Sequence, residues 1–130
     1  MAREHVELVR SALDAWNRGD VDGFCDHTSE DVVWLEIAGR PESDGSERAG
    51  RERLRQGFAE LFDAWESYHL DIEDVRDLGD RVLVLAREEA VGRASGMKID
   101  GHWAYLLWVK GSEIVRVEAY RDQALAFRQI

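Results

Sequence analysis

The stretch Trp16-Asn17-Arg18-Gly19-Asp20 connects two predicted helices, ending the first and beginning the second. Before it, residues 3–17 have apolar side chains at spacings of three and four, which is typical of a helix with one apolar face: Val6, Val9, Leu13 and Trp16. Gly19 suits the left-handed cap that ends such a helix, and Asp20 can cap a second one. This short second helix is predicted to bury Val21, Phe24 and Cys25.

The next segment alternates between strand, loop and helix signals. Residues 31–37 are rich in valine, tryptophan and isoleucine, which predicts a strand. Residues 38–50 contain the only proline and several glycines, so they are predicted to form a loop, a type of segment that often carries function. A long helix follows, and its apolar face is predicted to comprise Leu54, Phe58, Leu61, Phe62 and Trp65.

The second half of the chain is predicted to be sheet. Four strands are separated by turn signals too short for crossover connections, which predicts an antiparallel meander: residues 68–75, 81–93, 98–109 and 114–121. Residues 122–130 can form a last helical turn. The chain is therefore predicted to be one α+β domain covering residues 1–130, with three N-terminal helices on a curved, mainly antiparallel sheet.

Composition excludes several classes of protein. The chain has 130 residues, and its 17 basic and 27 acidic side chains give a net charge of −10. This acidic balance, without a basic cluster, argues against nucleic acid or an anionic membrane as partner. A single cysteine, Cys25, excludes an internal disulfide and favours a reducing compartment. No apolar run is long enough to span a bilayer and no signal-peptide pattern opens the chain, so a cytoplasmic location is expected.

The order of these motifs resembles the SnoaL-like branch of the nuclear-transport-factor-2-like (NTF2-like) superfamily. The matching motifs, in chain order, are the helix joint at residues 16–20, Glu30-Asp31-Val32-Val33-Trp34, Gly50-Arg51-Glu52, Gly79-Asp80-Arg81-Val82, and Ile114-Val115-Arg116 running to Tyr120-Arg121-Asp122. The resemblance implies a cone-shaped α+β barrel with a deep apolar pocket, and homodimers packed through the sheet. Members include ketosteroid isomerase-like enzymes, polyketide cyclases, dehydratases, epoxide hydrolases and proteins without known activity.

The resemblance points to Glu36 as the catalytic base. In isomerase-like members the base lies on the first strand, five residues after the second acid of the preceding pair, here Asp31. A carboxylate in an apolar cavity has a raised pKa, as a general base requires, and Trp34 shares the strand face of Glu36. The alternative is a solvent-facing glutamate at a strand end.

The expected partner groups of that base are missing. Isomerase-like members use a tyrosine on the first helix, where this chain has Ala12, and an acid on the fourth strand. That fourth-strand position aligns with Ala104 or Tyr105. The resemblance therefore implies an oxyanion-binding site that is either absent or rebuilt from Tyr105.

His102 and His69 titrate nearest neutral pH and could act with a tyrosine in acid–base dehydration, as in scytalone dehydratase-like members. Alternatively, both histidines lie at strand edges, partly in water. Arg87 can hold a substrate carboxylate, or it can pair with Glu89 or Glu118. No HExxH, CxxC or nucleotide-binding glycine spacing occurs, so no metal and no cofactor are expected.

Aromatic residues supply the expected walls of the substrate site, with Arg87 and Tyr120 as further contacts: Trp34, Phe58, Trp65 and Trp103. Trp103 and Tyr105 lie on one face of the fourth predicted strand. His102, Ala104, Leu106 and Trp108 lie on the other, which predicts a homodimer through the outer face of the sheet.

The leading hypothesis is an enzyme that acts without a cofactor on an apolar, cyclic small molecule by isomerisation, cyclisation or dehydration. Glu36 would accept the proton, and Tyr105 or His102 would donate it. The alternatives are a non-catalytic domain that binds an apolar small molecule, and a dimeric interaction domain.

Overall fold

The computed structural model describes residues 2–37 and 47–130. It confirms an α+β architecture with three helices before the last four strands. The helices are α1 (Ala2–Asn17), α2 (Val21–Cys25), α3 (Arg51–Ala64) and α4 (Gln123–Phe127). The strands are β1 (Thr28–Ile37), β2 (Glu47–Ala49), β3 (Trp65–Asp77), β4 (Arg81–Gly92), β5 (Lys98–Lys110) and β6 (Glu113–Tyr120).

The six strands form one mixed sheet in the order β2-β1-β6-β5-β4-β3. The meander predicted for the last four strands is confirmed, because β3, β4, β5 and β6 pair in sequence order and antiparallel. Strand β1 lies beside β6 and runs parallel to it, with Trp34 opposite Val117. The first strand in the sequence therefore pairs with the last strand in the sequence.

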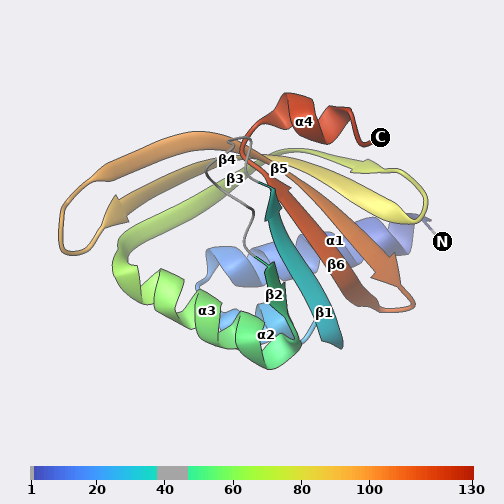
Figure 1. Ribbon diagram of the computed structural model, residues 1–130, viewed down its shortest axis with the longest axis horizontal. Helices are drawn as coiled ribbons and strands as arrows, with labels where there is room; N and C mark the ends of the chain where they lie inside the picture. Colours follow the sequence, from blue (N-terminus) through green and yellow to red (C-terminus); the bar gives the residue numbers. More distant parts are fainter. Residues whose placement is uncertain (1, 38–46) are drawn as a thin grey trace.

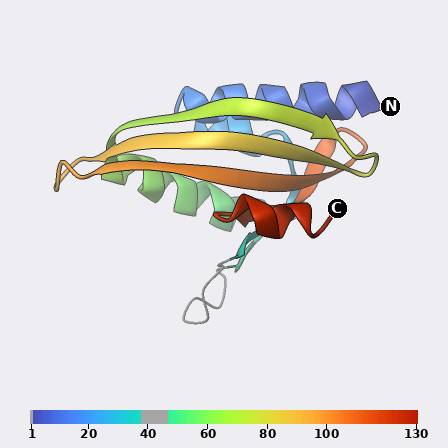
Figure 2. The same cartoon turned by 90° about the horizontal axis from the view of Figure 1, so that it is seen from above.

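The sheet is strongly curved, and helices lie on both of its faces. Figure 1 shows the strands arching over α1, α2 and α3, with α4 on the opposite side near the C-terminus. In the view from above, β3, β4 and β5 run side by side as long twisted strands (Figure 2). We call the face covered by α1–α3 the concave face and the face covered by α4 the convex face.

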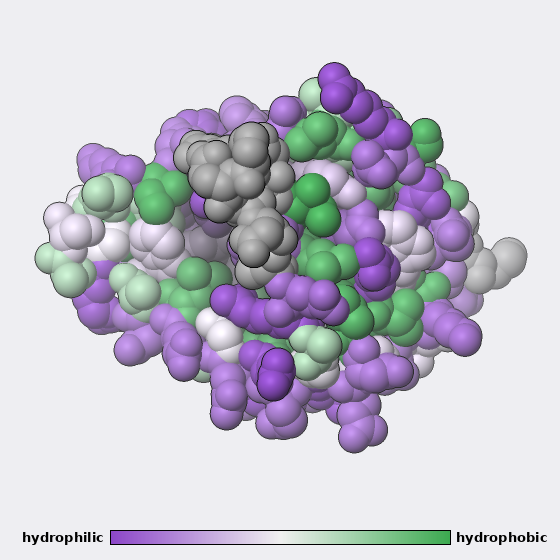
Figure 3. Space-filling view, in the orientation of Figure 1, coloured by the Kyte–Doolittle hydropathy of each residue, from purple (hydrophilic) through white to green (hydrophobic). Residues whose placement is uncertain are grey.

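Side chains alternate between these two faces, except where the strand register shifts, as it does between Trp108 and Val109. On β4, Val82, Val84 and Ala86 join the main core beneath the helices, whereas Leu83 belongs to a smaller cluster with Ala126 of α4. On β5, Trp103, Tyr105 and Leu107 likewise join the main core, whereas Ala104 and Leu106 join the smaller cluster. On the face drawn in Figure 3, hydrophilic residues line the lower edge along α3, and hydrophobic residues form separate patches.

The helix joint at residues 16–20 is built as its sequence predicts. Gly19 has a φ of 70°, and the side chain of Asp20 accepts a hydrogen bond of 2.9 Å from the backbone nitrogen of Gly23. The Asn17 side chain donates to the carbonyl of Leu70 and accepts from its N–H, both at 2.8 Å. This pair of bonds ties the end of α1 to β3.

Two sequence predictions need correction. Part of the predicted loop at residues 38–50 is a strand, because residues 47–49 pair with β1, with Val33 opposite Ala49; residues 38–46 lie outside the described residues. Trp65 is not on the face of the long helix. It is the first residue of β3, with a φ of −103° and a ψ of 133°.

Within residues 2–37 and 47–130, no helix is long and apolar enough to cross a membrane.

Candidate functional site

Aromatic rings fill the concave side of the sheet beneath the helices. Trp16 of α1 lies at the centre, with its ring edge-on to Phe24, Phe58 and Phe62 at centroid distances of 5.4, 4.6 and 4.8 Å. Trp34 of β1 stacks beside it at 6.3 Å. The structure thus brings together Trp34 and Phe58, two of the predicted walls, with ring centroids 4.9 Å apart.

These rings leave little free space among themselves. An apolar cavity of about 20 Å³ lies between them, and it is lined by Leu13, Trp16, Phe24, Trp34, Leu70, Tyr105 and Leu107. A cavity of this size has room for about one water molecule. The cavity that these described residues enclose is therefore small.

The polar groups of the concave face lie toward the hairpin formed by β4 and β5. Tyr68 of β3 donates a hydrogen bond of 2.9 Å from its hydroxyl to Oε2 of Glu88 on β4. Burial is the main cause that raises the pKa of Tyr68 well above its ordinary value, and the carboxylate of Glu88 adds to it. Glu88 is half-buried, and its carboxylate is held in place by this hydroxyl.

Tyr105 stands next to this pair. Its side chain is 8% exposed, and the indole of Trp103 stacks on it with centroids 5.9 Å apart. Burial raises the pKa of Tyr105 well above its ordinary value, and Tyr68, Glu88 and Glu36 raise it further. The phenol therefore stays protonated. Among the described residues its hydroxyl forms no hydrogen bond, so it can donate one to a bound molecule.

Glu36 does not lie in an apolar cavity, as the sequence had predicted. It lies on the concave face because it is opposite Ala119, which in turn is opposite Tyr105. Its side chain is nevertheless exposed, because it sits near the end of β1, beyond the rings that bury Trp34. The burial argument for its basicity is therefore wrong, whereas its position near Tyr105 keeps it among the candidate groups.

Glu88 and Tyr68 were not among the site residues predicted from the sequence. The residues of β4 named there, Arg87 and Glu89, point to the convex face, and Glu88 points to the other face. That other face reads Val82, Val84, Ala86, Glu88 and Ala90. A single acid among small apolar residues on a core-facing strand is the signal that could have identified Glu88.

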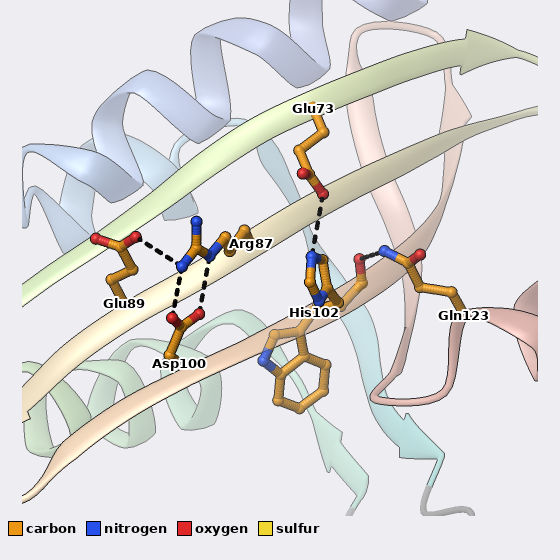
Figure 4. Close-up of polar contacts among 7 residues, drawn as sticks. Glu73, Arg87, Glu89, Asp100, His102 and Gln123 are labelled. Atoms are coloured by element: carbon orange, nitrogen blue, oxygen red, sulfur yellow. Dashed lines mark hydrogen bonds and ion pairs between the residues drawn. The ribbon is translucent and has the colours of Figure 1, made fainter.

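Arg87 and His102 are on the convex face and do not reach this site. Arg87 donates to Asp100 at 2.9 and 2.6 Å and lies 3.6 Å from Glu89 (Figure 4). His102 lies 3.9 Å from Glu73 and is largely exposed. The alternative of an Arg87–Glu89 pair is confirmed. A shared site for His102 and Tyr105 is wrong, because these residues are three apart on β5 and therefore point to opposite faces of the sheet.

Tyr120 is also on the convex face. It is 3% exposed, packs in the cluster beneath α4, and donates a hydrogen bond of 2.5 Å to Glu118. It therefore does not join Trp34 and Phe58 in lining a common site. His69, on β3, is exposed, as the alternative for the histidines predicted.

A shallow groove of about 400 Å³ lies across β3, β4 and β5 near the β4–β5 hairpin. Its lining is Ser67, Tyr68, His69, Glu89, Ala90, Val91, Lys98, Ile99 and Asp100. Asp100 is already paired with Arg87, which holds the pKa of this carboxyl below its ordinary value. In the part of the chain that the structure describes, no three histidine, cysteine or acidic side chains are grouped to hold a metal ion.

The sequence and the fold were both found to be similar to those of known proteins. The model of the SnoaL-like domain family matches residues 9–117. Among solved structures, an NTF2-like protein of unknown function from Burkholderia pseudomallei is 18% identical, with 96% of this chain and 95% of that chain covered and a TM-score of 0.79. No curated protein matches.

Two further similar structures contain small molecules. One is a hypothetical protein with a ketosteroid isomerase-like fold from Catenulispora acidiphila, in complex with trimethylamine. It is 21% identical, with 88% of this chain and 84% of that chain covered and a TM-score of 0.76. The other is TerC co-crystallised with polyporic acid, which is 18% identical, with 97% and 96% covered and a TM-score of 0.78. At these identities the likeness establishes the fold alone.

Proposed function

Since the chain belongs to the SnoaL-like domain family, we propose that it is a cofactor-independent enzyme that moves a proton on an apolar, cyclic small molecule. The observation that carries the proposal is the surroundings of Tyr105. A protonated phenol lies near two carboxylates, Glu88 and Glu36, against the stacked ring of Trp103. A hydrogen-bond donor and a base beside an apolar wall are the groups needed to abstract a proton next to a carbonyl.

Glu88 is the favoured proton acceptor. It is half-buried, and the hydroxyl of Tyr68 fixes the direction of its carboxylate. Tyr105 then donates a hydrogen bond to the carbonyl oxygen that gains charge as the proton leaves. Glu36, the base expected from the family resemblance, is the second candidate for the same role. Its exposure makes it the weaker one, because water stabilises its charged form.

The ligand class follows from the walls of the site. Aromatic side chains favour a flat apolar molecule, and the net charge of −10 disfavours nucleotides and other polyanions. Two proteins of the same fold were crystallised with small molecules, which supports a small-molecule site in this one.

Deuterium exchange tests the proposal directly. The protein is incubated with 2-tetralone in heavy water, and exchange of the protons next to the carbonyl is followed by NMR against buffer alone. Catalysed exchange is expected, with a loss of about 100-fold in Glu88→Gln and a smaller loss in Tyr105→Phe. Glu36→Gln distinguishes the two carboxylates, and Arg87→Gln, on the convex face, is the matched control. Exchange at the buffer rate would overturn the enzymatic proposal.

The small size of the cavity among the described aromatic rings favours a second candidate function, a non-catalytic binding domain. With a cavity of only about 20 Å³ among the rings, a ligand would rest on the rim near Tyr105 rather than enter the core. Ligand binding without catalysed exchange would select this function.

A homodimer through the convex face remains a proposal, but fewer residues support it than the sequence pattern indicated. Leu106 was expected to need a partner subunit, but it is fully buried within its own chain, in the cluster that α4 covers. Trp108 is half-buried, with the guanidinium groups of Arg81 and Arg116 at 5.7 and 5.6 Å from its ring. This residue is the one on which a dimer contact would rest.

A further inference from the structure

Arg121 occupies an unusual position at the end of β6. Strand β6 ends at Tyr120, which is opposite Ala104, and Arg121 is the exposed residue that follows it, beside Trp103. Its guanidinium carbon lies 4.6 Å from the centre of the Trp103 ring. Arg121 therefore lies on the concave side, next to the stacked pair of Trp103 and Tyr105.

This arginine has no carboxylate partner within the described residues. In the same part of the chain, Arg51, Arg87 and Arg116 are each paired with at least one acid. In a chain with ten more acidic than basic side chains, an arginine that stacks on an indole keeps its N–H donors available. The position is thus suited to an acceptor supplied from outside the chain.

A buried donor without a partner lies next to this arginine. Trp103 is 8% exposed, and in the described structure its buried indole N–H has no hydrogen-bond partner. Burying a donor without an acceptor is unfavourable, so such groups usually mark the place of a water or a ligand. The two donors and the Tyr105 hydroxyl come from adjacent residues of the sheet.

Next to these donors there is room for a molecule. Gly101 lies two residues before Trp103 on β5 and therefore faces the concave side, directly opposite Glu88. A Cβ atom at this glycine would meet nothing within 4 Å. The chain thus leaves open space at Gly101, whose neighbours on this face are Glu88 across the strands and Trp103 along β5.

Resting on the proposed function, we infer that Arg121 is a catalytic residue that binds the carbonyl oxygen of a neutral cyclic ketone. In the reaction, the C–H bond next to the carbonyl breaks and its proton passes to the carboxylate of Glu88. The electron pair forms the C=C bond of an enolate, and the carbonyl π electrons move to oxygen. Arg121 and Tyr105 donate hydrogen bonds to that oxygen, and the proton then returns to carbon.

A neutral ketone fits this site better than a carboxylate. The charge on the oxygen develops only when a proton has moved to Glu88, so the site gains no net charge during the step. A ligand that arrives as an anion would instead meet the repulsion of both Glu88 and Glu36. Arg121 then replaces the acid that isomerase-like members carry on the fourth strand.

A matched pair of probes tests Arg121 separately from the rest of the site. We compare the binding of 2-tetralone with that of tetralin, which has the same rings but no carbonyl. The wild-type protein is expected to bind 2-tetralone about tenfold more tightly, the ratio typical of one charged hydrogen bond. Arg121→Met is expected to remove this preference while keeping the affinity for tetralin, because methionine keeps apolar contact with Trp103. Arg121→Lys is expected to keep part of the preference for 2-tetralone over tetralin, because lysine keeps the positive charge.

Arg128→Met is the control for the loss of one positive charge and is expected to keep the preference; thermal unfolding of each variant confirms folding. If Arg121→Met retains the preference for 2-tetralone, or if the wild type shows none, the role of Arg121 is overturned while an apolar site stands. If the wild type binds neither probe, the proposed function fails and this inference fails with it. If Arg128→Met also loses the preference for 2-tetralone over tetralin, the role of Arg121 is overturned, because the preference would then depend on overall charge.

Discussion

The hydroxyl of Tyr68 on β3 donates a hydrogen bond of 2.9 Å to the carboxylate of Glu88 on β4, under the cover of the N-terminal helices. Cross-strand register does not place these two residues opposite each other, because Tyr68 is opposite Ala90 and Leu70 is opposite Glu88. The bond is therefore a diagonal contact across the concave face. It fixes a half-buried charge at the edge of an aromatic core.

Removing this hydroxyl tests the contact. Tyr68→Phe is expected to lower the free energy of unfolding by about 1–2 kcal/mol, because Glu88 loses a partner in a half-buried position. A double-mutant cycle with Glu88→Gln, followed by urea unfolding, is expected to give a coupling energy of about 1 kcal/mol. A coupling energy near zero would mean that the two side chains do not interact in solution.

Alkaline titration tests the environment of all three tyrosines. The pKa values of Tyr68, Tyr105 and Tyr120 are each raised, and burial is the largest cause in every case. Since the unfolded chain ionises its phenols at about pH 10 and the folded chain does not, stability is unaffected below that pH and falls as the pH rises above it. Phenolate absorbance is expected to appear together with the loss of circular dichroism. A tyrosine that ionises near pH 10 in the folded protein would contradict this.

Gly101 offers a way to fill the proposed site without disturbing the core. Because a Cβ at Gly101 would meet open space, Gly101→Leu is expected to leave the melting temperature unchanged or slightly higher. The same change is expected to weaken the binding of 2-tetralone by about tenfold, as steric overlap with the ligand requires. Gly101→Ala is the matched smaller change and is expected to have a smaller effect. Unchanged binding in Gly101→Leu would place the ligand elsewhere.

Asn17 is expected to contribute to stability through both bonds to Leu70. Asn17→Ala leaves the N–H and carbonyl of a nearly buried residue without partners, which is expected to lower the free energy of unfolding by about 1–3 kcal/mol. Asp14→Ala, an exposed change one turn earlier on α1, is the control and is expected to have little effect. Equal stability of the two variants would show that the tie between α1 and β3 is unimportant.

Trp108 tests the proposed dimer. If the wild type is a dimer through the convex face, Trp108→Glu is expected to release folded monomers, because a charge would be buried at the contact. Light scattering at micromolar concentration measures the change, and Met97→Glu, in the exposed turn between β4 and β5, is the control. A wild-type protein that is monomeric under these conditions would contradict the dimer.

Most of the fold could be predicted from local patterns, and the exceptions have physical causes. Helix periodicity and turn glycines identify α1, α2, α3 and the meander, because these features depend on neighbouring residues. Residues 47–49 were missed because this short strand has no apolar pattern of its own and forms only by pairing with β1. Trp65 was misplaced because its spacing from Phe58 and Phe62 continues the apolar pattern of the helix, although the backbone stops being helical before it.

The site was less predictable than the fold. Alternation on β5 correctly placed Trp103 and Tyr105 on one face, and His102 on the other. The depth at which a side chain is buried depends on the curvature of the whole sheet, which the sequence pattern does not contain. Glu36 was therefore predicted to be buried, and the half-buried Glu88 was overlooked.

The parallel pairing of β1 with β6 has a consequence for how the chain folds. Trp34 is held beside Val117, so the strand made early during synthesis acquires its neighbour only when nearly all of the chain has been made. Such distant pairing raises the contact order and requires closure of a large loop before any bond of this ladder is gained. Folding is therefore expected to begin in the β3–β6 meander, whose turns are short, and to finish when β1 docks on its edge.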